Sequence, residues 1–213
     1  MKKFLLTLVL MLPMLAFTGC GNDDEPQDVS VSDQSLLVGQ TYSLPDGAWT
    51  SSNDAVAKVE GGKVVAIRRG EAIIKGSSKS FKVEVSPSNN IIPDPYLKFG
   101  GSHNDVADYM ASLGGFDKPG LSLVQDYVRS TPVPLGYQYT FKNGEGLQSV
   151  TVMAFQKNFT ELEMAEYLKQ RYVPVAEQDG VFGFISLDKR IAVVFTIEVI
   201  KGNVTYIIQY HPV

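Results

Sequence analysis

The spacing of hydrophobic and polar positions changes part-way along the chain. From residue 29 to 87, short β-type runs alternate with turn residues about every eight to twelve positions, which is typical of an all-β sandwich. The run 81–85 alternates strictly between apolar and polar residues, so one of its faces should be buried. Gly61-Gly62 separates two of the runs and suits a two-residue hairpin turn. Residues 88–95, rich in Asn and Pro, indicate a linker.

Residues 96–213 predict an α+β domain in the order helix, three strands, helix, three strands. Two segments carry apolar residues at helical spacing. These residues are Val106, Tyr109, Met110 and Leu113 in the first segment and Met164, Tyr167 and Leu168 in the second. Asn104 and Thr160 are the candidate N-caps of the two helices.

The two halves of this region align without a gap when the chain is shifted by 58 positions. Residues 137–141 then lie on 195–199 with matching alternation, and Gly144 lies on Gly202. We therefore expect a duplicated αβββ unit, with repeats at about 103–155 and 161–213. Side by side, the repeats would form a six-stranded antiparallel sheet with both helices on one face.

The alternation also assigns side chains to the two faces of that sheet. The expected core consists of Tyr137, Tyr139, Phe141, Phe195, Ile197 and Val199, packed against Tyr109, Met110, Tyr167 and Leu168. The opposite face would carry Gln138, Thr140, Thr196 and Glu198. A face that no helix covers would form a broad, shallow surface, so these four residues are the candidate ligand-binding site. The order of elements resembles the paired αβββ modules of β-lactamase-inhibitor-protein-like domains, which weakly suggests partner binding and assigns no residues.

The N-terminus has the features of a secretory signal, residues 1–19. Two lysines precede an apolar run at residues 4–17, and the only cysteine of the chain, Cys20, follows two small residues. The segment resembles a bacterial lipoprotein signal, which implies a diacylated Cys20 as a membrane anchor. The alternative is an ordinary signal peptide that happens to contain a cysteine. Residues 20–28 carry four acids and read as a tether; they resemble the surface-export signal of Bacteroidetes-type lipoproteins, or are a plain spacer.

Four short motifs follow one another between residues 49 and 74. They are Trp-Thr-Ser-Ser-Asn at 49–53, Val-Ala-Lys-Val at 56–59, Gly-Lys-Val-Val-Ala at 62–66 and Gly-Glu-Ala-Ile-Ile at 70–74. In this order they closely resemble the group-2 bacterial immunoglobulin-like domain, here residues 29–87. The resemblance implies an extracellular spacer or adhesion module without catalytic residues.

Composition narrows the possible functions. Lys and Arg number 19 against 23 Asp and Glu, a net charge of −4, which argues against a nucleic-acid partner. One cysteine and two histidines offer little for a metal site, and no motif predicts a cofactor. Ser102, His103 and Asp105 are the residue types of a hydrolytic triad, but their adjacency at a helix start does not suit triad geometry.

The sequence therefore favours a non-enzymatic outer-membrane lipoprotein that is exposed on the cell surface and binds a glycan or a protein. For a glycan, Tyr127, Tyr206 and Phe184 would be candidate stacking platforms if they were exposed. The alternatives are an envelope assembly component or protein inhibitor and, more remotely, a hydrolase.

Overall fold

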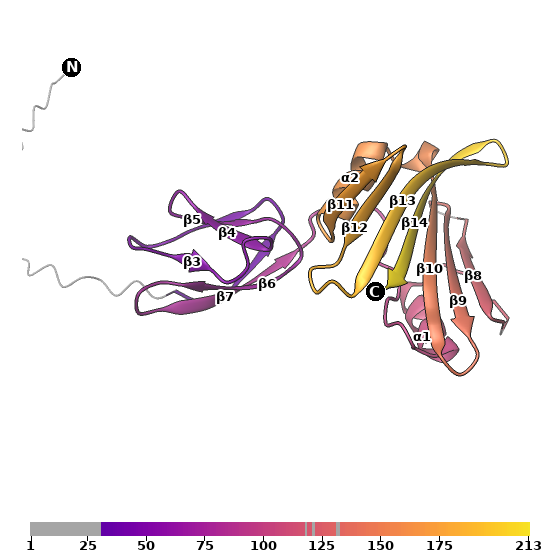
Figure 1. Ribbon diagram of the computed structural model, residues 1–213, viewed down its shortest axis with the longest axis horizontal. Helices are drawn as coiled ribbons and strands as arrows, with labels where there is room; N and C mark the ends of the chain where they lie inside the picture. The colour runs from indigo at the N-terminus through magenta and orange to yellow at the C-terminus, as the bar shows by residue number, and fades with distance from the viewer. Residues whose placement is uncertain (1–30, 118, 121, 131–132) are drawn as a thin grey trace, which may run out of the picture. The chain divides into compact units, whose positions relative to one another are not determined.

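Two hydrophobic cores organise the computed structural model, which describes residues 31–117, 119–120, 122–130 and 133–213 (Figure 1). One core lies within residues 56–85 and the other within residues 92–210. The predicted signal peptide, Cys20 and the acidic tether lie outside the described residues.

Two small sheets share the first core. One has the order β1 (Gln34–Leu37), β7 (Ser80–Ser86), β6 (Gly70–Lys75), β3 (Thr50–Ser51), and the other has the order β2 (Thr41–Ser43), β5 (Lys63–Ala66), β4 (Ala57–Glu60). Strand β1 runs parallel to β7, and every other pair is antiparallel. Phe81, Val83 and Val85 of β7 are buried, as the alternation predicted. Gly61 and Gly62 turn the chain between β4 and β5 with φ of 56° and 72°, a conformation that glycine adopts without strain.

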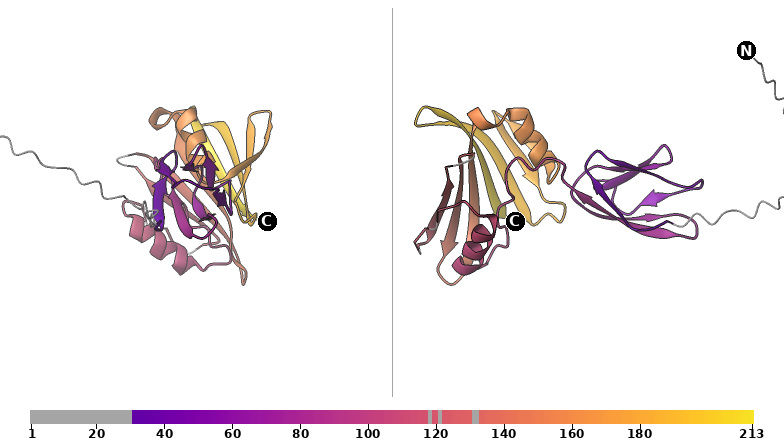
Figure 2. Two further views of the ribbon diagram at one scale, coloured as in Figure 1. Left: turned by 90° about the vertical axis from the view of Figure 1, so that its left-hand side faces the viewer. Right: turned by 180° about the vertical axis from the view of Figure 1, so that it is seen from behind.

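The second core lies between two helices and one seven-stranded antiparallel sheet. The elements are α1 (His103–Leu113), β8 (Val124–Arg129), β9 (Leu135–Lys142), β10 (Gly146–Phe155), a 3₁₀ turn (Gln156–Asn158), α2 (Glu161–Lys169), β11 (Val173–Gln178), β12 (Val181–Ile185), β13 (Ile191–Ile200) and β14 (Asn203–Pro212). Their order across the sheet is β11-β12-β13-β14-β10-β9-β8. The two helices lie on the same face of this sheet (Figure 2).

Both helices begin with a capping box. The Ser102 hydroxyl accepts from the backbone N–H of Asp105, whose carboxylate accepts from the backbone N–H of Ser102. Thr160 and Glu163 make the same pair of hydrogen bonds at the start of α2. The expectation for Thr160 is confirmed. Asn104 is not the first cap, because the helix begins at His103 and its N-cap is Ser102, two residues earlier, which has the spacing of a capping box with Asp105.

Most of the predicted core of this domain is buried. Tyr137, Tyr139, Phe141, Phe195, Met110, Tyr167 and Leu168 are at most 3% exposed, and Tyr109 is partly buried. Ile197 and Val199 are wrong as core residues, being 36% and 71% exposed. They alternate onto the helix side of β13, but they lie toward the tip of the β13–β14 hairpin, which extends beyond the helices (Figure 1).

The expected six-stranded sheet is also corrected, because it has seven strands. The additional strand, β11, forms a hairpin with β12 through Asp179 and Gly180 and lies at the edge of the sheet. Five of its six residues are exposed, and it contains Pro174. An edge strand with so little burial has no clear apolar alternation, which explains why the hydrophobic pattern does not predict it.

Burial within α2 gives a direct test of this arrangement. Met164 is fully buried in the core, whereas Leu162, two residues earlier on the same helix, is 70% exposed. Met164→Ala should lower the free energy of unfolding by about 2–5 kcal/mol, because it removes buried methylene groups and leaves a cavity. Leu162→Ala is the matched control and should change it by less than about 0.5 kcal/mol. Urea unfolding followed by circular dichroism measures both, and equal effects would contradict the assigned faces of α2.

Candidate functional site

The four predicted ligand-binding residues lie on the sheet face opposite the helices, because each alternates with core residues of β9 or β13. They form two separate pairs. Gln138 and Thr140 are on β9, and Thr196 and Glu198 are on β13. Strands β10 and β14 lie between them, so β9 and β13 are roughly 14 Å apart at the usual strand spacing, and the pairs are also offset along the strands. The structure therefore places them on one surface without bringing them into one cluster.

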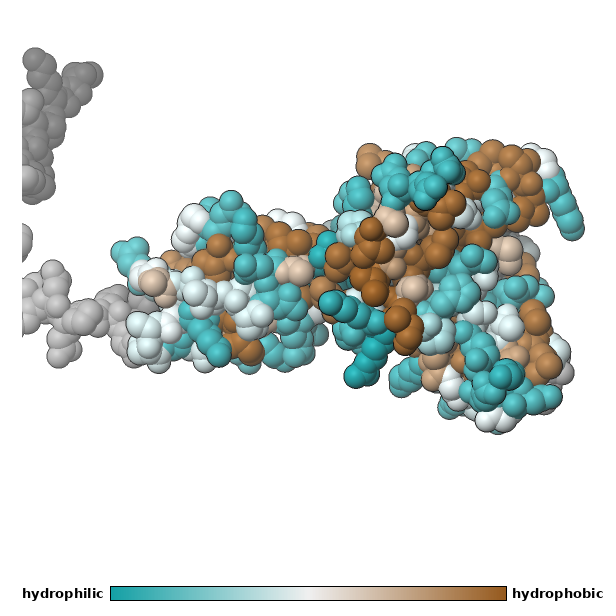
Figure 3. Space-filling view, viewed as in Figure 1, coloured by the Kyte–Doolittle hydropathy of each residue, from teal (hydrophilic) through white to brown (hydrophobic). Residues whose placement is uncertain are grey.

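The surface between these pairs is more apolar than the sequence analysis expected. In the pairing register, Met153 of β10 lies beside Ile207 of β14, which in turn lies beside Thr196. Val194 lies beside Gln209 in the next row. Figure 3 shows apolar residues gathered over β12 and β13. Because no described helix covers this face, it is an open, partly apolar surface, which we call the uncovered face.

The aromatic residues considered as glycan platforms are not available for stacking. Tyr127, Tyr206 and Phe184 are 3%, 0% and 5% exposed. Each belongs to the core between the sheet and the helices.

Ser102, His103 and Asp105 meet at the start of α1, but their contacts are those of a helix terminus. The Ser102 hydroxyl donates to the Asp105 carboxylate at 2.7 Å. The ring of His103 stacks on Phe141 with centroids 3.9 Å apart, and its Nε2 lies 3.0 Å from the carbonyl oxygen of Ser122. Because Ser102 hydrogen-bonds to the carboxylate and not to the imidazole, this arrangement lacks the nucleophile–base contact of a triad. These hydrogen bonds to Ser102 lower the pKa of Asp105.

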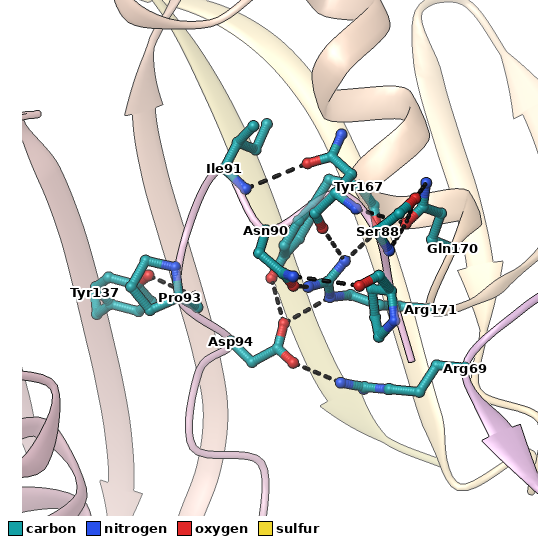
Figure 4. A network of polar contacts seen from close by, with 12 residues as sticks. Arg69, Ser88, Asn90, Ile91, Pro93, Asp94, Tyr137, Tyr167, Gln170 and Arg171 are labelled. Carbon is teal, nitrogen blue, oxygen red and sulfur yellow. Dashed lines mark hydrogen bonds and ion pairs between the residues drawn. The ribbon is translucent and has the colours of Figure 1, made fainter. Parts of the chain in front are cut away.

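The densest polar cluster lies around Asp94 at the end of the predicted linker (Figure 4). Its carboxylate accepts from Arg171 Nε at 2.6 Å and from the Tyr167 hydroxyl at 2.8 Å. Its second oxygen pairs with Arg69 at 2.5 Å. The Arg171 side chain is 1% exposed, and its guanidinium also lies 3.9 Å from the centre of the Tyr167 ring. Asp94 is thus the counter-charge of a buried arginine.

The rest of the cluster fixes the linker backbone to α2. Arg171 donates to the carbonyl oxygen of Asn89 and to the side-chain oxygen of Asn90. The side-chain oxygen of Gln170 accepts from the backbone N–H groups of Ser88 and Asn89, each at 2.8 Å. The linker predicted at residues 88–95 is therefore held by long-range hydrogen bonds.

Electrostatics favour the ionised form of Asp94. Partial burial opposes ionisation, but the positive charges of Arg171 and Arg69 outweigh it and lower the pKa of Asp94. Burial also opposes ionisation of the nearby phenols, and there it prevails: it raises the pKa of Tyr172 to about 12 and that of Tyr167 well above its ordinary value. The phenols stay neutral, and that of Tyr167 donates its hydrogen bond to Asp94, so we interpret the cluster as a structural anchor for the linker. Arg171 directly after the second helix was its only visible sequence signal.

A pocket of about 400 Å³ opens between α2 and the edge hairpin β11–β12. Most of its lining residues are apolar, and three of them, Glu161, Lys169 and Glu177, are charged. The lining consists of Glu161, Ala165, Lys169, Pro174, Val175, Ala176, Glu177, Phe182, Phe184 and Phe195. The hydrophobic pattern does not predict this pocket, because four of these residues belong to β11, a strand that the pattern does not predict.

Within the described residues, no three His, Cys, Asp or Glu side chains come together as a metal site would require. The described helices are all too short or too polar to span a membrane. No protein family, curated protein or solved structure matches the chain.

The Asp94 cluster predicts a specific dependence of stability on pH. Asp94→Asn should lower the free energy of unfolding at pH 7 by about 2–3 kcal/mol, because Arg171 would stay buried without its carboxylate. The pKa of Asp94 is lower in the folded state, so its stabilising effect is complete above about pH 4 and is lost as the pH falls through the folded-state pKa. The difference in the free energy of unfolding between wild type and Asp94→Asn should therefore decrease below pH 4. Urea titrations from pH 2 to 7 measure it, with exposed Asp46→Asn as the control; a constant difference would contradict the ionised pair.

Proposed function

We propose that the chain is a lipid-anchored, non-enzymatic binding protein of the cell envelope, displayed at the outer-membrane surface. In this proposal Cys20 carries the lipid, residues 29–87 form a group-2 bacterial immunoglobulin-like spacer, and residues 96–213 bind the ligand. The observation that carries it is the uncovered face: both helices lie on one side of a seven-stranded sheet and leave the other side open (Figure 2). A broad, partly apolar face of this kind suits an extended partner.

Two features support the finer parts of the fold assignment. Two sheets that share one core, with β1 parallel to β7, suit an immunoglobulin-like module. For the duplication, helix α2 begins 58 positions after α1, and the pair Thr151–Gln209 between β10 and β14 is also separated by 58. Thr151 and Gln209 would therefore occupy the same position in the two repeats, and the repeats would be arranged symmetrically about this pair. In this interpretation β11 is an addition to the second αβββ repeat.

A protein is the better-supported ligand class. Glycan sites commonly present exposed aromatic rings, and the three candidate rings are buried. The uncovered face instead offers the partly exposed side chains of Met153 and Val194 between the polar pairs on β9 and β13, while Ile207 between them is 8% exposed. An apolar centre with a polar rim is typical of a protein interface. An envelope assembly component or an inhibitor would use the same face and differ only in its partner.

Site-specific photocrosslinking on intact cells tests the role of the uncovered face. A photoreactive phenylalanine at Gln138 or Thr196 should crosslink to one discrete protein, because both residues border the apolar centre. The same group at Leu162, exposed on α2 on the helix side, is the matched control and should give no such product. Crosslinks from Leu162 alone would contradict the proposal. If no protein crosslink forms, and the wild type binds a glycan that Thr196→Arg does not bind, the ligand of the uncovered face is a glycan and not a protein.

The proposed anchor has its own test. Mass spectrometry of the protein purified from its native membrane should find a mature N-terminus at Cys20 with a diacylglyceryl group. Cys20→Ser should shift the protein from the membrane to the soluble fraction, because the proposed lipid is its attachment. Lys63→Ser, an exposed substitution outside the signal, should stay in the membrane. A protein that keeps residues 1–19 and has a free thiol at Cys20 would contradict the proposed anchor.

A further inference from the structure

The C-terminal end of α2, in the second domain (96–213), receives hydrogen bonds from the first domain (31–86). The last four carbonyl groups of a helix have no partner within the helix. In α2, three of them accept from residues 170–172, which follow the helix. The last one, on Lys169, accepts from Nε of Arg68 at 2.9 Å. The first domain therefore completes the cap of a helix in the second domain.

Arg68 and Arg69 make further contacts with the same end of α2. Arg68 Nε also lies 3.0 Å from the carbonyl oxygen of Tyr172, and the backbone N–H of Arg69 donates to the carbonyl oxygen of Gln170 at 2.9 Å. Gln170, the C-cap residue, has right-handed helical φ and ψ, so no left-handed glycine turn closes this helix. The two arginines take that place, and their positive charge suits the negative end of the helix dipole. The Arg69 side chain continues to Asp94 (Figure 4).

A leucine of the second domain packs in the opposite direction. Leu187 lies in the turn between β12 and β13, between Ser186 and Asp188, yet it is partly buried against the core of the first domain. Gly70 leaves room for it, because a Cβ at Gly70 would lie 3.4 Å from Leu187 Cδ1 and 2.8 Å from Val56 Cγ2. The Ser186 hydroxyl donates to the Asp188 carboxylate at 2.6 Å and stiffens the turn that presents the leucine. Each domain thus supplies a group that the other one uses.

The linker adds no hinge between these contacts. Gln170 and Arg171 hold its backbone at Ser88 and Asn89, beside the carbonyl groups that Arg68 and Arg69 reach. Domains with a small interface ordinarily move relative to one another. Here such movement would expose Leu187 and take the hydrogen-bond donors away from the end of α2. Residues 31–213 accordingly form one compact unit.

We propose that Arg68, Arg69 and Leu187 lock the two domains into one rigid body, in which the first domain is a fixed arm and not a flexible spacer. The lock gives the uncovered face one orientation relative to the first domain. This inference goes beyond the proposed function, and it does not depend on the anchor or on the ligand.

The distance between labels on the two domains tests the lock in the full chain. Cys20→Ser removes the only native thiol, and nitroxide labels on Glu84→Cys and Leu162→Cys then mark an exposed position of each domain. Pulsed electron paramagnetic resonance should give one narrow distance distribution, because the domains do not move separately. A broad distribution, as from a flexible linker, would overturn the proposal.

Removing the two arginines should release the lock. Arg68→Ala with Arg69→Ala should make the distance distribution about twice as wide, as for domains joined by a linker alone. Lys63→Ala with Lys75→Ala is the matched control, because it removes the same charge from exposed positions of the same domain and should leave the width unchanged. Leu187→Ser tests the other side of the contact and serves if the double arginine variant does not fold. A wild-type width in either folded variant would overturn the proposal.

Amide hydrogen exchange measures the lock at a single hydrogen bond. The backbone N–H of Arg69, which donates across the domains to Gln170, should exchange at least about a hundredfold more slowly than in an unstructured peptide. The backbone N–H of Ala66, which donates to Gln40 within the first domain, is the internal reference. In Leu187→Ser, exchange at Arg69 should accelerate and exchange at Ala66 should not change. Unprotected exchange at Arg69 in the wild type, beside a protected Ala66, would show that the domains separate and would overturn the proposal.

Discussion

The antiparallel pairing of β10 with β14 is the contact on which the second domain depends. It joins β8–β10 to β11–β14, so a single sheet can carry both helices on one face. Side chains alternate along strands, so a shift of this register by one residue would move Val150 and Val152 to the uncovered face and leave Thr151 in the core. Fully buried Tyr210, paired with Val150, would be displaced in the same way. The register thus sets both the core and the composition of the open surface.

The Asp94 cluster holds a polar linker in place where it runs beside an apolar core. The chain from Ser88 to Asp94 brings backbone groups next to buried residues, and such groups need hydrogen-bond partners. Arg171 and Gln170 provide them from the C-terminal end of α2. Burying Arg171 is favourable only with a counter-charge, which Asp94 supplies. The hydroxyl of Tyr210 is buried without a hydrogen-bond partner in the described residues, a local cost in an otherwise satisfied region.

The sequence predicted those parts of the fold whose side chains have a periodic pattern. Strand β9 alternates fully, from Leu135 to Phe141, and both helices have clear apolar stripes, so their faces were correctly assigned. The pattern does not predict strand β11, because its residues are mostly exposed. It does not predict the exposure of Val199 either, because alternation gives a face but not the extent of the helix that covers it. The Asp94–Arg171 pair was invisible because its residues are 77 positions apart. The four candidate site residues were assigned to one face, but their separation depends on strand order, which the pattern did not contain.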